Sequence, residues 1–500
     1  MPRLSPPGRI FGNCQPVYWR YHEVPLSSGA TCLDGSPYGF YFMDGLPNKR
    51  EPKTMRFNES WVLYLEGGGW CSSPEDCALR AETTRGSSVG WPRNGTISIG
   101  GLVNRCCFCT RFCKFRRVFL KSCDGHSFAG DATIDVPPRA DAPDAPPTRL
   151  RSAGLRILSG VLDELLLHYG LAAAKSILVA GCSAGGMSAL LNAERIRAEL
   201  RTRGVHPDRF KVASLAGIFF STNSSVAATR RRVVSSNGDT STGEHEYAVT
   251  ATGRTSDRVS PFWKQMRAAV QLGKMAIPAR CSDTMPPGEA WRCLMGLSLV
   301  EALPEDLPAF VYQSRLDLWQ TNCVLAAGDS RYSEFNCSSS KAWRNCLGWM
   351  QPLRSSNNKC SAGQWATLRA YEEANHAALV NSPALRRVGY GSFVHSCYDH
   401  CPSPYALINT GALAQPGAYN DSVSMRSALF DWFLLEQPSR VPAWNHTHHG
   451  CWNGLVANKL GKQQAEWCRK PECGQPDKMH HAETRAIENV IRKRGWRWQL

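Results

Sequence analysis

Short apolar runs alternate along the chain with amphipathic segments of helical spacing. Residues 61–65, 176–180 and 310–313 are mostly large apolar residues, which predicts short strands buried on both faces. Residues 155–169 and 186–203 carry apolar side chains every three or four positions, which predicts helices. Strands that alternate with such helices form a mostly parallel central sheet with helices on both faces, so the sequence predicts an α/β fold.

The size and composition of the chain support a large packed core. The chain has 500 residues, of which 43% are apolar and 20% are charged, so the composition of an intrinsically disordered protein is excluded. No stretch reaches the roughly 18 unbroken apolar residues that a membrane-spanning helix needs. We therefore expect no transmembrane segment.

Stretches of loop-like composition divide the chain. Residues 135–148 are rich in Pro, Ala and Asp, and because proline removes a backbone donor we expect an irregular surface insertion there. Residues 221–260 are rich in Ser, Thr and Arg, which predicts a second, long insertion. We therefore predict a single domain over 30–440, an N-terminal segment over 1–29, and a Cys-, His- and Lys-rich appendage over 441–500.

Cysteine usage indicates the compartment. Twenty-one cysteines spread along the chain favour oxidative folding and secretion, and the odd number leaves at least one thiol unpaired. Asn-x-Ser/Thr triplets, the acceptors of N-glycosylation, fit that compartment; they begin at Asn58, Asn94, Asn223, Asn336, Asn420 and Asn445. The first residues lack the apolar core of a signal peptide. We therefore expect either that a leader is missing from this sequence or that the compartment is wrong.

The net charge of +16 favours anionic partners such as acidic polysaccharide, membrane headgroups or nucleic acid. Basic residues gather at 230–232 and around the cysteines at 105–117. Because neither an RNA-stacking motif nor zinc-finger spacing accompanies them, we expect a solvated basic face and no nucleic-acid partner.

Metal-ligating residue types also occur in clusters. Cys106, Cys107, Cys109 and Cys113 include a C-x-x-C pattern, but no second pair follows at zinc-ribbon spacing, so disulfides are favoured over zinc. The histidines at 446–449 are typical of a solvated tail. Neither cluster therefore predicts a metal site.

A G-x-S-x-G pattern at 181–185 lies between a predicted strand and a predicted helix. In that context a tight turn exposes the serine hydroxyl, so Ser183 is a candidate nucleophile and the amide of Ala184 a candidate oxyanion donor. The glycines at both ends let the strand and the helix approach each other. Ser88 lies in a second match at 86–90, but neither a strand nor a helix flanks it, which predicts a loop serine.

A serine nucleophile needs a base and an orienting carboxylate, which follow it along the chain in this architecture. Asp317 lies just beyond the predicted strand at 310–313, and His400 lies in a later loop. A pair such as Cys397 and Cys401 would fix that loop. His395 is an alternative base, and Asp317 and His400 taken singly are also compatible with a capping aspartate and an ordinary loop histidine.

Collinear motifs over roughly residues 30–435 resemble the pectin acetylesterase family, which includes the animal Wnt deacylase Notum. These motifs are WVLYLEGGGWC at 61–71, CDGHSFAGD at 123–131, GCSAGG at 181–186, DLWQ at 317–320 and SCYDHC at 396–401, with ATCLDGSP at 30–37 as an N-terminal match.

The resemblance implies an α/β-hydrolase-like serine esterase without metal or cofactor. Carried over by motif position, the triad is Ser183 as nucleophile, Asp317 as orienting acid and His400 as base. The oxyanion hole is formed by the main-chain amides of Gly69, Trp70 and Ala184. The alternative for the glycines at 67–69 is a plain turn that ends a strand.

Other residues bear on the substrate that the resemblance implies. Residues 214–221 lack the acidic residues that the family usually has there, which puts substrate preference in doubt. Cys281 and Cys293 resemble a cysteine pair of the animal branch, whereas Cys182 and Cys401 resemble the plant and microbial branch. We favour removal of O-acetyl groups from an extracellular polysaccharide such as pectin, by a monomer. A palmitoleoyl-protein carboxylesterase and a catalytically silent fold that binds glycan or lipid are the alternatives.

Overall fold

A computed structural model gives the structure of the protein. It describes residues 19–45, 59–93, 102, 111–138, 147–220, 248–249, 255–256, 261–325, 360–395, 400–401, 411–413, 422–434 and 444–447.

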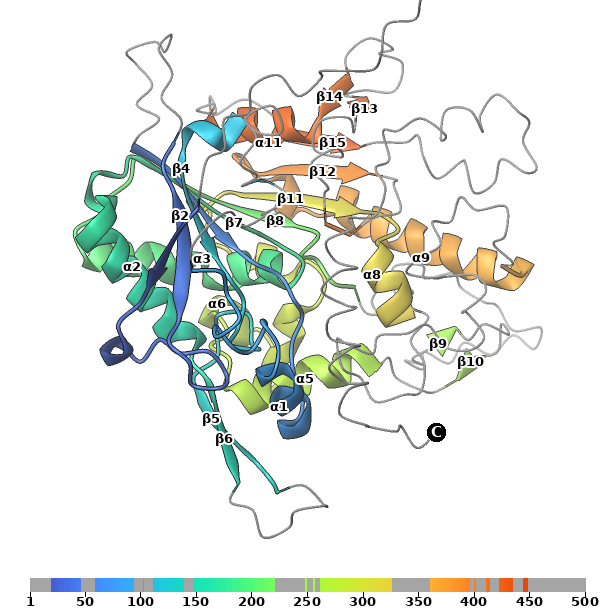
Figure 1. Cartoon of the computed structure of the whole chain (residues 1–500). Coiled ribbons are helices and arrows are strands. Elements are labelled where there is room, and N and C mark those ends of the chain that lie inside the picture. Colours follow the sequence, from blue (N-terminus) through green and yellow to red (C-terminus); the bar gives the residue numbers. More distant parts are fainter. Residues whose placement is uncertain are drawn as a thin grey trace, which may run out of the picture.

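An 11-stranded sheet forms the centre of the molecule (Figure 1), with the strand order β1-β2-β4-β3-β7-β8-β11-β12-β15-β13-β14. Neighbours from β4 through β15 pair in parallel, and those at the two ends pair antiparallel. The strands are β1 (Arg20–Glu23), β2 (Gly39–Met43), β3 (Ser60–Leu65), β4 (Arg116–Leu120), β7 (Ser176–Cys182), β8 (Arg209–Leu215), β11 (Ala309–Ser314), β12 (Gly391–His395), β13 (Gly411–Leu413), β14 (Ser422–Ser424) and β15 (Trp444–Thr447).

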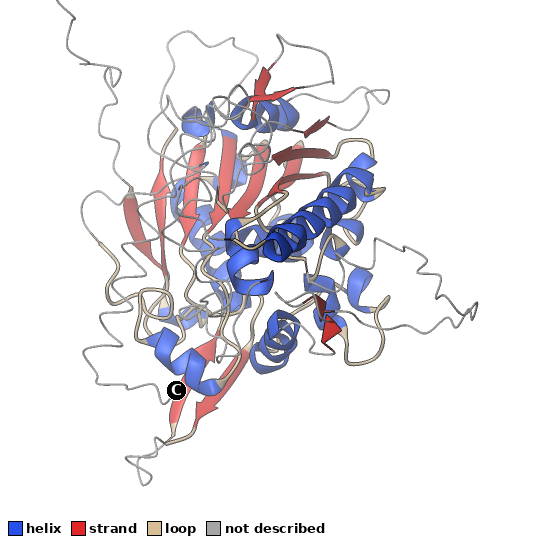
Figure 2. Cartoon of the chain, turned by 90° about the vertical axis from the view of Figure 1, so that its right-hand side faces the viewer, coloured by secondary structure: helices blue, strands red, loops and turns tan. Residues whose placement is uncertain are grey.

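Helices surround this sheet (Figure 2). The α-helices are α1 (Pro74–Ala81), α2 (Gly154–Tyr169), α3 (Ala184–Thr202), α5 (Pro261–Gly273), α6 (Ala279–Ser282), α7 (Ser298–Glu301), α8 (Leu318–Gln320), α9 (Ala362–Asn381) and α11 (Met425–Leu434). The short 3₁₀ turns are η1 (Leu26–Ser28), η4 (Arg111–Lys114), η5 (Leu171–Ala173), η6 (Ala290–Leu294) and η9 (Ala384–Arg386), and η7 (Thr321–Leu325) is a π-helical turn.

The central elements form where the sequence predicts them. Every residue of β3, β7 and β11 is buried, as expected for strands covered on both faces. Helix α2 ends at Gly170, whose φ of 69° is a conformation that glycine adopts without strain. Helix α3 begins one residue after Ser183 and crosses from β7 to β8, which pair in parallel.

Alternate side chains of each central strand point to opposite faces of the sheet. On β3, Trp61 and Leu63 belong to the larger core cluster, which contains buried residues of α2 and α3. Val62 and Tyr64 belong to a second cluster, which contains buried residues of α11. The molecule is therefore a mixed α/β protein with a large central sheet, which agrees with the α/β-hydrolase-like fold that the resemblance implies.

The expectation of irregular structure over 135–148 is wrong at both ends. Strand β5 (Ala132–Val136) pairs antiparallel with β6 (Thr148–Ser152), and this hairpin projects away from the main sheet (Figure 1). The prolines of this stretch lie outside the paired residues, so they remove no hydrogen bond from the ladder. The buried side chains of Ile134 and Leu150 fix the hairpin in a small apolar cluster.

The sheet extends beyond the predicted domain limits. Strand β1 lies within the segment predicted as 1–29, and β15 lies within the appendage predicted as 441–500 and pairs in parallel with β12. Within 221–260, only the paired strands β9 (Ala248–Val249) and β10 (Thr255–Ser256) are described, and 451–500 lie outside the described residues. The division into segments otherwise stays a prediction. Among the helices of the described residues, none is long and apolar enough to cross a membrane.

Candidate active site

The parallel strands place distant parts of the sequence at one edge of the sheet. Strands β3, β7, β11 and β12 run in the same direction, so the loops after them meet at the edge formed by their carboxyl ends. Those loops carry the glycines at 67–69, Ser183, Asp317 and His400, respectively.

Ser183 occupies a tight turn between β7 and α3. Its φ of 60° and ψ of −131° are strained for a residue with a side chain. The flanking glycines make the turn possible: a Cβ on Gly181 would lie 2.2 Å from the carbonyl oxygen of Gly185, and a Cβ on Gly185 would lie 2.1 Å from that of Leu65. The strand and the helix therefore approach as closely as the sequence predicts.

A hydrogen-bonded chain joins Ser183, His400 and Asp317. The Oγ of Ser183 lies 2.7 Å from Nε2 of His400, and Nδ1 of His400 lies 2.8 and 3.0 Å from the carboxylate oxygens of Asp317. The carboxylate is fully buried and His400 is 9% exposed. With the proton on Nδ1, the imidazole donates to the carboxylate and accepts from the hydroxyl, an arrangement that can activate a serine.

Two glutamines hold the Asp317 carboxylate, one through its side chain and one through its backbone amide. Nε2 of Gln313 donates to it at 3.2 Å, and the backbone amide of Gln320 donates at 2.9 Å, so Asp317 also caps α8. The Gln320 side chain in turn joins Ile218 and Phe220 of the loop after β8. Gln320 lies within the DLWQ motif at 317–320, but no local sequence pattern indicates this role.

The glycine-rich loop packs directly against the serine turn. A Cβ on Gly67 would lie 2.9 Å from Cβ of Ser183. Buried Arg80 donates to the carbonyl oxygen of Gly68 at 2.6 Å, and Arg85 donates to that of Gly67. These contacts fix the backbone that continues into Gly69 and Trp70. The loop therefore does more than end β3, because it also packs against the turn that carries Ser183.

Three buried aromatic rings and the half-buried Trp319, from separate elements, pack beside His400. Phe219 contacts Trp70, Phe262 and Trp319 with ring centroids 5.2, 5.8 and 5.4 Å away, and Trp319 stacks on His400 at 6.0 Å. We call Trp70, Phe219, Phe262 and Trp319 the aromatic cluster. Sequence reasoning missed Phe219 and Phe262, because no local pattern connects the loop after β8 with α5.

A disulfide crosses the site. Cys401 pairs with Cys182, with 5.9 Å between their Cα atoms and 219 residues between them in sequence. The suggested pairing of Cys401 with Cys397 is therefore wrong, because the loop after β12 lies beside the end of β7 and brings a distant cysteine closer. The pairing of Cys281 with Cys293 is confirmed. Cys32–Cys123 and Cys71–Cys77 are further disulfides.

The alternative candidates lie elsewhere. His395 is the last residue of β12, where its backbone pairs with Ser314, whereas His400 contacts Ser183. Ser88 lies in a bend, as predicted for a loop serine, and its hydroxyl donates to the carbonyl oxygen of Pro37 at 2.6 Å.

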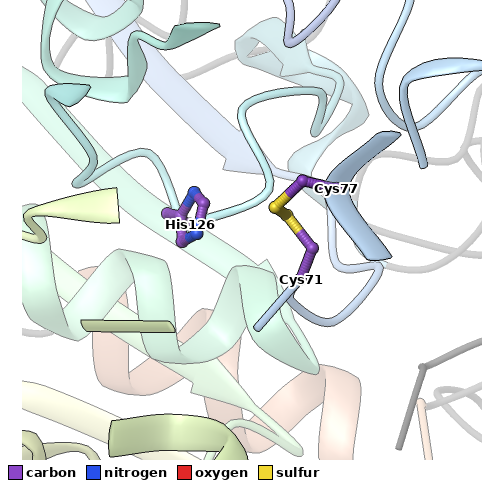
Figure 3. A group of neighbouring side chains, drawn as sticks. All are labelled: Cys71, Cys77 and His126. Atoms are coloured by element: carbon purple, nitrogen blue, oxygen red, sulfur yellow. A yellow bond between two sulfur atoms is a disulfide. The ribbon is translucent and has the colours of Figure 1, made fainter. Parts of the chain in front are cut away.

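Within the described residues, two groups have ligand atoms close enough together for a metal ion. Cys71, Cys77 and His126 form one (Figure 3), but the sulfurs are bonded to each other and offer no thiolate. His22, Glu164 and His168 form the other, joined by their own hydrogen bonds and ion pairs on β1 and α2. Of the clustered cysteines, Cys113 is disulfide-bonded, and 103–110 lie outside the described residues.

Two buried titratable groups, Asp124 and His126, lie near the Cys71–Cys77 disulfide. Burial raises the pKa of Asp124 to about 6, and burial lowers the pKa of His126 to about 4. The unfolded chain binds a proton at His126 between about pH 6.5 and 4 that the folded protein does not, so acid destabilises the fold through this group. Asp124 acts in the opposite direction between about pH 6 and 4, because the folded protein keeps a proton that the unfolded chain releases.

His126→Gln is therefore expected to remove the loss of stability in acid that His126 causes. Between pH 7 and pH 5 the free energy of unfolding of the wild type should fall by about 2 kcal/mol relative to the variant, from a linkage of about 1.36 kcal/mol per pKa unit. Denaturant unfolding of both proteins at the two pH values measures this change. An unchanged difference between them would mean that His126 does not titrate as its burial requires.

Comparisons with known proteins agree on one family. A family model for pectinacetylesterase matches residues 21–443. Pectin acetylesterase 11 of Arabidopsis thaliana is 26% identical over 414 residues, which cover 83% of this chain and 86% of that protein. Pectin acetylesterase 5 of the same plant is 24% identical over 429 residues, which cover 85% of this chain and 82% of that protein.

A relative whose name gives a different activity also matches. The human palmitoleoyl-protein carboxylesterase NOTUM is 27% identical over 295 residues, which cover 58% of this chain and 50% of that protein. Both kinds of relative are carboxylic ester hydrolases by name. The family match, which spans most of the sheet and the edge that carries the serine, shows that this chain belongs to the pectinacetylesterase family and is a carboxylic ester hydrolase.

Proposed function

We propose that this protein is a serine esterase in which Ser183 is the nucleophile, His400 the general base and Asp317 the orienting acid. The observation that carries the proposal is the hydrogen-bonded chain from Ser183 through His400 to the buried Asp317. His400 takes the hydroxyl proton as Ser183 attacks the ester carbonyl, and Asp317 stabilises the resulting imidazolium. Water then hydrolyses the acyl-enzyme by the reverse proton path.

The amides of Gly69, Trp70 and Ala184 form the oxyanion hole in this proposal. Ala184 is the first residue of α3, where an amide has no carbonyl partner within the helix. Arg80 and Arg85 hold the carbonyl groups of the preceding glycines, which supports a backbone fixed before substrate binds. Each such donor is worth about 3 to 4 kcal/mol in the barrier.

We propose that the preferred acyl group is acetyl. The aromatic cluster fills the space beside the reacting pair, since Trp70, Phe219 and Phe262 are buried and contact one another. A short acyl group needs little room there, whereas a palmitoleoyl chain needs a long apolar cavity. The named activity of the plant relatives, which match most of the chain, also supports this choice.

The acceptor we propose is an extracellular acidic polysaccharide such as pectin, and the protein is secreted. The net charge of +16 favours an anionic polymer. Disulfides that join distant parts of the chain support folding in an oxidising compartment. The proposed enzyme acts as a monomer and needs no cofactor.

Hydrolysis of nitrophenyl esters of increasing chain length tests the acyl preference. The wild type should prefer acetate, and Phe262→Ala should raise kcat/KM for hexanoate relative to acetate about tenfold, because a few buried methylenes are worth about 1 to 3 kcal/mol. Phe430→Ala is the matched control, since Phe430 lies in the core cluster on the other face of the sheet and should not change this ratio.

The outcomes separate the candidate functions. A wild-type optimum at eight carbons or more would contradict the acetyl preference and favour a palmitoleoyl-protein carboxylesterase like the human relative. Folded protein that hydrolyses no ester, yet binds glycan or lipid, would favour a silent fold. Release of acetate from acetylated pectin, with none from palmitoleoylated peptide, is the result that the proposal predicts.

A further inference from the structure

The Cys182–Cys401 disulfide joins the immediate neighbours of the two reacting side chains. Cys182 is the last residue of β7 and precedes Ser183, and Cys401 follows His400. Further disulfides between described residues join Cys32 to Cys123, Cys71 to Cys77 and Cys281 to Cys293. Within the described residues, this bond alone links the segment of Ser183 to the segment of His400 covalently.

The two segments differ in how the fold supports them. Ser183 lies between a fully buried strand and the long helix α3, which fixes its backbone on both sides. His400 follows the end of β12 by five residues and lies in neither a helix nor a strand. Its side chain contacts Ser183, Asp317 and Trp319, and these contacts orient the imidazole ring.

We propose that the Cys182–Cys401 disulfide is a positioning clamp, which holds the backbone of His400 at the distance that lets Nε2 reach the Ser183 hydroxyl. This inference rests on the proposed roles of Ser183 and His400. A displacement of about 1 Å at a reacting group can cost about 100-fold in rate. The clamp therefore acts on the catalytic step, and substrate binding depends on it little.

The double variant Cys182→Ala/Cys401→Ala tests the clamp. With nitrophenyl acetate, kcat per folded molecule should fall about 100-fold while KM stays within about threefold. Cys281→Ala/Cys293→Ala is the matched control, because it removes another buried disulfide that is not adjacent to the triad in sequence. Its kcat should stay within about threefold of wild type at a temperature well below its unfolding midpoint.

Reversible reduction gives a second measurement that does not depend on folding of the variant. Dithiothreitol passes two electrons to the disulfide, leaves two cysteine thiols and is itself oxidised to its cyclic disulfide. The loss of wild-type kcat should follow alkylation of Cys182 and Cys401 as measured by mass spectrometry. In a parallel sample that is not alkylated, the activity should return when the reductant is replaced by oxidised glutathione, which takes up the two electrons as the Cys182–Cys401 bond forms again.

A folded double variant with wild-type kcat, or full activity after both cysteines are alkylated, would overturn the clamp. A wild-type protein that neither hydrolyses nitrophenyl acetate nor reacts with a fluorophosphonate would instead overturn the proposed function. The two failures are therefore distinguishable.

Discussion

Ser183→Ala is expected to lower kcat for nitrophenyl acetate by about 10⁶-fold, because the attacking hydroxyl is lost while the oxyanion donors and the rest of the site remain. His400→Ala should lower kcat by about the same factor, since it removes the base that lies within hydrogen-bond distance of the Ser183 hydroxyl. The double variant Ser183→Ala/His400→Ala should lose little more than either single variant, because the pair acts as a unit. Steady-state kinetics of the three proteins measure these losses.

Ser88→Ala is the matched control for this prediction. Ser88 lies in the second G-x-S-x-G match and is fully buried, but its hydroxyl donates to the carbonyl oxygen of Pro37. The variant should lose about 1 kcal/mol of stability and keep its kcat. Losses at Ser183 and His400 that multiply in the double variant, or a large loss at Ser88, would contradict the assigned roles.

Asp317→Asn is expected to lower kcat by about 10⁴-fold with KM little changed. The Asp317 carboxylate accepts from His400, from the Gln313 side chain and from the backbone of Gln320. An asparagine has a single acceptor oxygen, so its amide hydrogens must face one of these donors. The imidazole then loses both its partner charge and the tautomer that lets Nε2 accept from Ser183.

Asp306→Asn is the control for the change of charge. Asp306 is exposed and pairs with Arg197, which is largely buried, away from the triad, so its variant should keep kcat within about twofold. A loss at Asp317 that appears in KM rather than kcat, or one no larger than that of the Asp306 variant, would show that Asp317 serves only as the cap of α8.

Local patterns predict the centre of the fold well. The apolar runs of β3, β7 and β11 are buried over their whole length, and the leucine spacing of α2 ends at the glycine that stops it. Each of these elements is specified by residues within itself or next to it. The turn at Ser183 was predictable for the same reason, because Gly181 and Gly185 lie in the same short motif.

Features that depend on distant partners were not predictable in this way. The β5–β6 hairpin was missed because its prolines dominate the composition, while its stability comes from Ile134 and Leu150 packed beside a disulfide. Cys401 pairs across the sheet with Cys182, which no spacing within its own loop indicates. Phe219 and Phe262 meet only because the loop after β8 and helix α5 lie at the same edge.

Covalent labelling by a fluorophosphonate, followed by peptide mapping, tests the central claim most directly. Folded wild-type protein should take up one label per chain on Ser183, lose its esterase activity in proportion, and fail to react after Ser183→Ala. Inactivation with the label on another residue, or an active enzyme that keeps its activity with Ser183 fully labelled, would contradict the account.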